Sequence, residues 1–372
     1  MRKHILTLLT LMTAVACNNN SVKLFDAADF TAELDGKQIS LYTIKSGDIT
    51  AQITNYGGRV VSLWTPDRDG NAADVVIGYE NIDRYIHNTG ERFFGASPGP
   101  VANRIGGASF KIGDEVYELS KNDGNNTLHG GFTGIDNLVW DVVALSEDSI
   151  TFSVLHPDGL DGFPGNKTIT MTYSIADNAL KVEFKAVTDK ATPINLAHHS
   201  FFNLRGCGNG DILGHIVTIN AGKTTPVNSE LIPSGEIVDV EGTPLDFREP
   251  HAIGERIDAD NEQIRYGHGY DHNWVIDRKT PSDLEFAASA YEPESGRLLE
   301  VYSDQPGMQF YSGYFFDGSY KLKNGAPASR NCSFAFETQK FPDSVNHDNF
   351  PGTIVAPGEE YTHTCIYSFS TK

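Results

Sequence analysis

The sequence predicts an all-β protein, folded as one large antiparallel sandwich. Apolar and polar residues alternate with a period of two in several segments, turn-forming residues separate these segments at short intervals, and long stretches of helical periodicity are missing. The length of 372 residues by itself favours about two domains. Because the composition does not change after residue 30, we instead expect a single β-sandwich domain over residues 31–372.

Five segments carry the alternation, which is typical of strands that turn one face to water. They are residues 49–53, 150–154, 168–173, 180–184 and 333–337. Turn-forming residues predict reversals of the chain at 66–70, 112–114, 176–178 and 294–296. Short helices are expected only at residues 82–85 and 252–256.

The charge of the chain excludes two classes of partner. Lys and Arg number 29 against 49 Asp and Glu, which gives a net charge of −20. Binding to nucleic acid or to an anionic membrane surface requires a basic surface, so neither is expected. Hydrophobic residues make up 39% of the chain, which is enough for a large core.

The N-terminus is predicted to be a bacterial lipoprotein signal peptide over residues 1–16. Two basic residues precede an apolar stretch, and small residues stand immediately before Cys17. Cys17 would then be the lipidated first residue, and residues 17–30 a polar tether that holds the protein on the periplasmic side of a bacterial membrane. Because Ala14 replaces the more usual Leu, cleavage without lipidation is the alternative, giving a soluble periplasmic or secreted protein.

Three further cysteines, Cys207, Cys332 and Cys365, are widely spaced and have neither a CxxC motif nor a histidine at ligand spacing. They therefore indicate no zinc or redox site. We expect buried free thiols, and one disulfide among them is the alternative in an oxidising compartment.

Polar residues interrupt the strand patterns in four segments, which are candidates for a binding site: residues 102–105, 126–131, 196–203 and 267–274. A fifth segment, residues 334–339, places a carboxylate in a strand suited to burial. There Glu337 shares a face with Ala335 and Gln339, opposite two phenylalanines. Glu337 is either a solvated surface residue or a partly desolvated general base with a raised pKa.

Two histidine positions are candidates for proton transfer. His198 and His199 are consecutive, so on a strand they face opposite sides and only one of them enters a cleft. The other is then structural. His129 precedes Gly130 and Gly131, where the backbone either approaches a ligand closely or makes a turn.

Three other side chains offer hydrogen bonds to hydroxyl groups. Asn103 and Arg104 form either an ordinary surface pair or a set of donors in a cleft. Asp271, which is flanked by two aromatic residues, is either a turn residue or an acceptor for sugar hydroxyls. Metal-binding and phosphate-binding motifs are missing, and two prolines remove amide donors from the glycine-containing segment 95–100. An uncharged ligand is favoured.

Six motifs, taken in order along the chain, resemble the aldose 1-epimerase family, also called galactose mutarotases. They are residues 55–63, 101–105, 126–131, 195–204, 269–273, and 336–339 with 341–343. The similarity covers almost the whole mature chain. It implies a large antiparallel β-supersandwich of the galactose mutarotase type, with an open sugar cleft, no cofactor and a free aldohexose as substrate.

The resemblance assigns roles to single residues. Glu337 corresponds to the general base, His199 to the general acid and His129 to a second active-site histidine. The positions that correspond to sugar-hydroxyl contacts are Asn103, Arg104, Asp271 and Gln309. An anionic Glu337 and a cationic His199 are expected to stabilise each other's charge near neutral pH.

Two positions depart from the family pattern. Gly99-Pro100 stands where the family usually has Gly-Arg, and His198-His199 stands where it usually has Asn-His. Neither change removes an acid or a base, but both bear on how a substrate fits.

The function implied by the resemblance is interconversion of the α and β anomers of free hexoses such as glucose and galactose, by acid/base ring opening and closure. The alternative is a non-catalytic sugar-binding lipoprotein on the same fold, which could dispense with Glu337. An epimerase for phosphorylated hexoses would need more basic residues at the cleft, and a glycoside hydrolase would need two carboxylates of separate roles. The sequence favours neither a monomer nor a dimer.

Overall fold

The computed structural model describes residues 22–88 and 90–372. The predicted signal peptide over residues 1–16 and the predicted lipidation site Cys17 lie outside the described residues. Within the described ranges, no helix is both long enough and apolar enough to cross a membrane.

The predicted tether over residues 17–30 is too long at its C-terminal end. Residues Ala27–Phe30 form a 3₁₀ helix (η1) that is capped by the side chain of Asp26, and the Phe30 side chain is fully buried. Phe25 packs against the same apolar cluster. The packed part of the chain therefore begins before residue 31.

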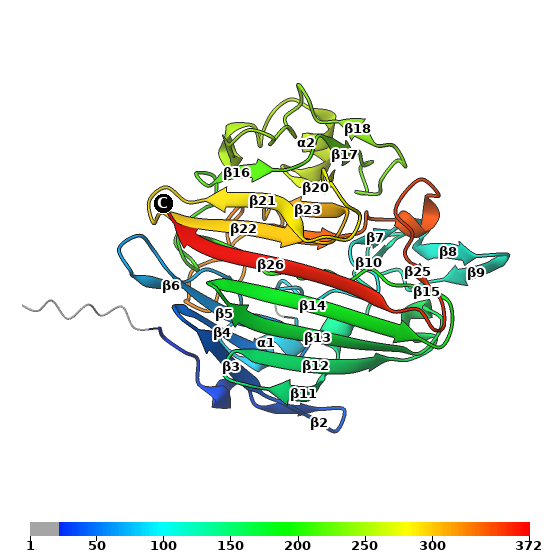
Figure 1. The fold of residues 1–372 in the computed structure, drawn as a ribbon, viewed down its shortest axis with the longest axis horizontal. Helices are drawn as coiled ribbons and strands as arrows, with labels where there is room; N and C mark the ends of the chain where they lie inside the picture. Colours follow the sequence, from blue (N-terminus) through cyan, green and yellow to red (C-terminus); the bar gives the residue numbers. More distant parts are fainter. Residues whose placement is uncertain (1–21, 89) are drawn as a thin grey trace, which may run out of the picture.

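A nine-stranded antiparallel sheet forms one layer of the sandwich and runs across the molecule in Figure 1. Its strands, in spatial order, are β11 (Asp141–Leu145), β12 (Ser149–His156), β13 (Lys167–Ala176), β14 (Ala179–Thr188), β26 (Tyr361–Thr371), β22 (Arg297–Ser303), β21 (Glu285–Tyr291), β16 (Ile216–Ile219) and β19 (His251–Ala252). The C-terminal strand β26 lies in the middle of this sheet, so the end of the chain joins two groups of strands distant in sequence.

Two smaller sheets accompany it. The five-stranded sheet has the order β18 (Val238–Asp239), β17 (Lys223–Thr225), β20 (Asp271–Val275), β23 (Gly307–Tyr311) and β24 (Ala335–Gln339). The four-stranded sheet has the order β3 (Leu41–Ser46), β4 (Ile49–Thr54), β5 (Arg59–Pro66) and β6 (Ala72–Asp74).

The remaining elements are short. Two-stranded pairs are formed by β1 (Ala32–Leu34) with β2 (Lys37–Ile39), β7 (Arg104–Ile105) with β10 (Thr127–Leu128), β8 (Ser109–Ile112) with β9 (Glu115–Glu118), and β15 (Thr192–Pro193) with β25 (Ile354–Val355). The helices are α1 (Ile82–Ile86), α2 (Glu262–Gly267) and the 3₁₀ turns η2 (Gly106–Ala108), η3 (Ile135–Asn137), η4 (Leu160–Gly162), η5 (Ile253–Glu255) and η6 (Ser344–Asn346).

The local predictions are mostly confirmed. All five alternating segments are strands, namely β4, β12, β13, β14 and β24, and each of the four predicted turns joins two neighbouring strands. The helix expected at residues 82–85 is α1, whereas residues 252–256 hold only the 3₁₀ turn η5. Helix α2 was not predicted; Asn261 caps it by accepting hydrogen bonds from the backbone of Gln263 and Ile264.

The expected water-facing side is wrong for two of these strands. Strands β12, β13 and β14 alternate between buried and more exposed residues, as predicted. Strand β24 is buried on both faces, and β4 nearly so. Alternation in sequence therefore identified the strands but not what covers their polar faces.

The five-stranded sheet separates the core from the site. Trp274, Phe310 and Phe336 point from β20, β23 and β24 into the main core cluster, which also contains Val301 and Tyr367 of the nine-stranded sheet. Because side chains alternate along a strand, the neighbouring polar residues of β20, β23 and β24 point to the opposite face. This polar face is where the candidate site is built.

Cys207, Cys332 and Cys365 are free thiols, and the last two are buried. The expectation of free thiols is confirmed, and the alternative of a disulfide among these three residues is not.

Candidate active site

The register of the five-stranded sheet places three predicted residues side by side. Gln309 pairs with Asn273 on one side and with Glu337 on the other. Asp271, two residues before Asn273, lies on the same face. The Gln309 Nε2 donates a hydrogen bond to Asp271 Oδ1 over 2.6 Å, which fixes the orientation of that carboxyl group.

His199 reaches Glu337 from a different part of the chain. The Nε2 of His199 lies 3.3 Å from Oε1 of Glu337, and both side chains are at most 6% exposed. The segment around His199 was expected to be a strand, but it pairs only through isolated bridges such as Ala96 to His199 and Phe202 to Phe334. Its backbone is nevertheless extended enough to separate the two neighbouring histidines.

His198 points away from Glu337, as the sequence predicts. Its Nδ1 lies 3.1 Å from the Tyr173 hydroxyl and its Nε2 lies 2.7 Å from the Ser200 hydroxyl. Both ring nitrogens are thus occupied by protein groups in the core. Only His199 of this pair faces the cleft.

His129 enters the site from a loop with an unusual backbone. Its φ of 50° is left-handed, and Gly130 follows with a φ of 86°. A Cβ on Gly130 would lie 2.0 Å from the carbonyl oxygen of Gly99, so only glycine permits this close approach. The His129 ring is 5.3 Å from the His199 ring, centroid to centroid.

A backbone hydrogen bond fixes the protonation of His129. The N–H of Asn103 donates to His129 Nδ1 over 3.0 Å. Burial lowers the pKa of His129 well below its ordinary value, so the ring is neutral at neutral pH. Because Nδ1 accepts a hydrogen bond, the single proton of the neutral ring is on Nε2. His129 therefore presents a donor to the cleft.

This tautomer argues against a metal centre at the site. The ligand atoms of His129, His199 and Glu337 lie within 4.8 Å of one another, a spacing that a metal ion would accept. A histidine binds a metal through a nitrogen that carries no proton, and the free nitrogen of His129 is the protonated one. The cluster is better suited to donating and accepting protons.

Asn103 and Arg104 complete one wall. Asn103 adopts a left-handed φ of 61°, and its side-chain oxygen accepts from the backbone N–H of Arg104. The Arg104 Nε donates to Asp123 Oδ2 over 2.8 Å, so the guanidinium is held in place and its charge is balanced. These residues are buried rather than an ordinary surface pair.

The assembled cavity has a volume of about 130 Å³. Its lining consists of Glu91, Phe93, Asn103, Arg104, Leu128, His129, His199, Phe201, Asp271, Tyr311, Phe315 and Glu337. Six of the seven predicted site residues are thus brought together. Gln309 is the exception, because it lies behind Asp271 and supports it without lining the cavity.

Sequence reasoning missed Glu91 and four aromatic residues of the lining. Phe93 packs against both active-site histidines, at ring distances of 4.5 Å to His129 and 6.1 Å to His199. Phe315 is 56% exposed at the rim, and its ring stacks on Tyr311 at 6.1 Å. The consecutive aromatic residues at 93–94 and 314–316 were the available signal.

Burial dominates the electrostatics of the acid and base. Desolvation, reinforced by the charge of Asp271, raises the pKa of Glu337 well above its ordinary value. Desolvation lowers the pKa of His199 to about 3. The expectation that the two residues hold each other charged is therefore wrong, because the desolvated surroundings favour a neutral carboxylic acid beside a neutral imidazole.

Three buried polar atoms at the site have no hydrogen-bond partner among the described residues. They are Oε2 of Glu337, Nδ1 of His199 and Oε1 of Gln309. Buried polar groups in folded proteins are nearly always paired, so each exception needs an explanation. Glu337 and His199 line the cavity, so their unpaired atoms are available to a polar ligand.

Comparison with known proteins follows the same lines. The sequence model of the family described as "Aldose 1-epimerase" matches residues 40–368. The chain is 40% identical to galactose mutarotase of Mus musculus over 335 residues, covering 90% of this chain and 95% of that protein. It is 32% identical to aldose 1-epimerase of Escherichia coli K12 over 339 residues, covering 90% and 96%.

Solved structures agree in fold. An aldose epimerase homologue from C. elegans superimposes with a TM-score of 0.82 at 28% identity, covering 90% of this chain and 99% of that chain. Galactose 1-epimerase from Lactobacillus acidophilus gives a TM-score of 0.79 at 25% identity, covering 91% and 97%. The fold is thus the all-β sandwich that the sequence predicted, and the chain belongs to the aldose 1-epimerase family.

Proposed function

We propose that the protein interconverts the α and β anomers of free hexoses, with Glu337 as general base and His199 as general acid. The observation that carries this proposal is the 3.3 Å contact between His199 Nε2 and Glu337 Oε1 at the base of the cleft. Galactose is named in the description of the mouse relative, and glucose and galactose are the substrates we propose here.

The reaction needs two proton transfers in each direction. The Glu337 carboxylate takes the proton of the anomeric hydroxyl while His199 gives a proton to the ring oxygen, and the bond between the anomeric carbon and the ring oxygen breaks. The open-chain aldehyde rotates about its first carbon–carbon bond. Ring closure on the other face of the carbonyl then returns both protons, so the enzyme is regenerated. Each positioned transfer contributes roughly 10²–10⁴-fold.

The desolvated cleft assists ring opening. The step converts a carboxylate and an imidazolium into a carboxylic acid and a neutral imidazole, so it removes two charges from a buried place. This proposal is supported by the raised pKa of Glu337 and the lowered pKa of His199, both of which favour the neutral pair. Before ring opening, the Glu337 carboxylate and the His199 imidazolium must form. Hydrogen bonds from the sugar hydroxyls stabilise this charged pair.

Other residues hold the ring while the anomeric carbon moves. Asp271 is oriented by Gln309, and Arg104 is oriented by Asp123. The protonated Nε2 of His129 donates to a sugar oxygen. Holding the reactants in one geometry is itself a large part of catalysis.

The non-catalytic alternative has no support. A binding module needs hydroxyl contacts but no buried acid and base at hydrogen-bonding distance. A phosphorylated substrate is also disfavoured, because among the described residues Arg104 is the one Lys or Arg that lines the cavity, and Asp123 balances its charge.

The test is polarimetry on freshly dissolved α-glucose and α-galactose. The wild-type protein is expected to accelerate the approach to equilibrium, and Glu337→Gln is expected to lower the rate by roughly 10²-fold or more. Glu249→Gln, an exposed site outside the cavity, is the matched control. Full activity of Glu337→Gln would place the base elsewhere, and a wild-type protein that binds sugar without acceleration would restore the binding-module hypothesis.

For the location of the protein, we propose a lipid anchor at Cys17 on the periplasmic side of a bacterial membrane. The basic residues, apolar stretch and small residues before Cys17 support it. The variant Cys17→Ala is expected to leave the membrane fraction and to lose incorporated fatty acid. A parent protein that is already soluble and free of fatty acid would point to cleavage without lipidation.

A further inference from the structure

We propose that the cleft also accepts amino sugars, and that Glu91 binds the ammonium group on the carbon next to the anomeric carbon. The substrate class is 2-amino-2-deoxyhexoses. The proposal rests on the anomer interconversion proposed above and adds a specificity-determining residue to the same cleft.

Close contacts with two tyrosines constrain the backbone of Gly90 and Glu91. Its carbonyl oxygen accepts from the Tyr79 hydroxyl over 3.2 Å. At the preceding Gly90, a Cβ would lie 2.4 Å from that hydroxyl and 2.7 Å from the Tyr320 ring, so the chain passes closely between the two tyrosines. The Glu91 side chain therefore starts from a fixed position on the cavity wall.

One carboxylate oxygen of Glu91 is used by the protein and the other is free. The Oε1 accepts the backbone N–H of Phe93 over 2.8 Å, which restricts the orientation of the carboxylate. Among the described residues, nothing donates a hydrogen bond to Oε2. Glu91 lines the cavity, so this oxygen is available to a ligand.

Glu91 lies at the reacting end of the cleft. Phe93, which Glu91 holds, packs on the rings of His129 and His199. After burial and Asp271, the negative charge of Glu91 contributes to raising the pKa of Glu337, so the two carboxyl groups are within electrostatic reach. When the anomeric carbon lies at Glu337 and His199, the substituent on the next sugar carbon is therefore near Glu91.

The charges of the cavity favour a cation. The carboxyl groups of Glu91 and Asp271 line it beside the neutral Glu337, and the guanidinium of Arg104 is balanced by Asp123. Burial raises the pKa of Glu91, and an ammonium group bound beside it favours the ionised carboxylate. Arg59 and Arg92 lie behind the Glu91 loop, and both pair with Asp136. An ammonium group offers three donors and a positive charge to this surface, whereas a phosphate or a uronic acid adds a further negative charge.

The experiment compares kcat/KM for glucosamine and glucose, with glucuronic acid as the anionic counterpart. For the wild-type protein we expect the order glucosamine, glucose, glucuronic acid. The variant Glu91→Gln keeps the acceptor for the Phe93 N–H and removes the charge. We expect it to lower the ratio of glucosamine to glucose by roughly tenfold. Glu249→Gln changes the net charge equally outside the cavity and should leave the ratio unaltered.

Each outcome separates this inference from the proposed function. If glucose is not accelerated at all, the anomer interconversion itself fails. If glucose is accelerated but glucosamine is handled no better than glucuronic acid, or if Glu91→Gln leaves the ratio unchanged while its melting temperature is native, Glu91 does not recognise an ammonium group. A lowered ratio with native stability supports the assignment.

Discussion

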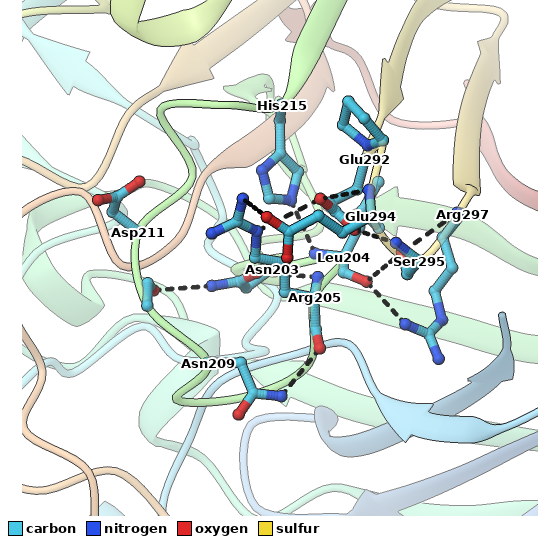
Figure 2. Close-up of polar contacts among 12 residues, drawn as sticks. Asn203, Leu204, Arg205, Asn209, Asp211, His215, Glu292, Glu294, Ser295 and Arg297 are labelled. Carbon is cyan, nitrogen blue, oxygen red and sulfur yellow. Dashed lines mark hydrogen bonds and ion pairs between the residues drawn. The ribbon is translucent and has the colours of Figure 1, made fainter.

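Two buried groups of polar and charged residues differ in how their hydrogen bonds are completed. At the turn after β21, the carboxylate of Glu292 is fully buried and accepts from the Arg205 Nε over 3.3 Å and from the backbone of Glu294 and Ser295 over 3.0 and 2.6 Å. Arg297 donates to the carbonyl oxygen of Leu204 in the same group (Figure 2). In the cleft, by contrast, Glu337 and His199 each keep an atom that no described residue bonds to.

The pKa of each carboxyl group records this difference. Burial opposes ionisation of Glu292, but hydrogen bonds from Ser295, Glu294 and Arg205 outweigh it and lower the pKa to about 2. Glu337 exposes as little surface but is more strongly desolvated, and among the described residues it lacks such donors, so its pKa is raised. A buried carboxylate supplied with donors stabilises the fold, whereas one deprived of them is kept ready for a substrate.

The largest expected effect is on turnover, at His199. Replacing His199 by Asn removes the acid while keeping a polar side chain, so the rate of mutarotation should fall by roughly 10²–10⁴-fold. The melting temperature should fall modestly, because Asn loses the packing of the His199 ring on Phe201 and Phe93, while no described residue bonds to its Nδ1. Polarimetry and thermal unfolding measure the two effects. A variant that retains turnover would show that the proton comes from another group.

The second effect falls on stability, at Glu292. Replacing Glu292 by Gln removes the charge that satisfies Arg205 and two backbone N–H groups, so the free energy of unfolding should fall by roughly 2–4 kcal/mol. Because the site lies outside the cavity, the kcat of the folded variant should stay close to that of the wild type. Urea unfolding with parallel polarimetry tests this. A large loss of kcat at native stability would make the two regions functionally connected.

The two carboxyl groups should also give opposite pH dependence. Since the folded pKa of Glu292 is lowered to about 2, its stabilisation is complete above the ordinary value of 4.5 and is lost as the pH falls toward 2. Since the folded pKa of Glu337 is raised, ionising it costs stability as the pH rises above 4.5.

Glu337→Gln removes that cost. Its free energy of unfolding relative to the wild type should therefore increase as the pH rises above the ordinary value of 4.5, by at most about 1.4 kcal/mol per pH unit. Urea unfolding at several pH values measures it, and Glu249→Gln is the control. A relative stability that does not change with pH would mean that the pKa of Glu337 is not raised.

The sequence predicted the strands and most of the site residues. It did not predict the properties that depend on how other segments bury a side chain. Alternation along one strand was enough to place Glu337 opposite the core and to separate His198 from His199. A raised pKa of Glu337 was one of two alternatives open from the sequence, and burial selects it. The expectation that His199 keeps Glu337 charged was wrong, because desolvation depends on segments far away in sequence. Glu91 left no local signal, since a glutamate in an irregular segment looks the same whether it faces a cavity or water.

The smallest expected effect belongs to His198, which is buried like His199 but is held by protein partners. Its ring nitrogens meet the hydroxyl groups of Tyr173 and Ser200, and burial lowers its pKa to about 3, so it is neutral.

Asn at position 198 is the residue usual in the family, but it is shorter than histidine and reaches only one of the two hydroxyl groups. His198→Asn should therefore cost roughly 1 kcal/mol of stability and leave turnover within a few-fold, because the residue faces the core and not the cleft. Polarimetry beside His199→Asn decides the matter. If His198→Asn were the inactive variant and His199→Asn the active one, His198 and not His199 would be the acid. The presence or absence of hydrogen-bond partners at the two rings would then not distinguish the catalytic histidine from the structural one.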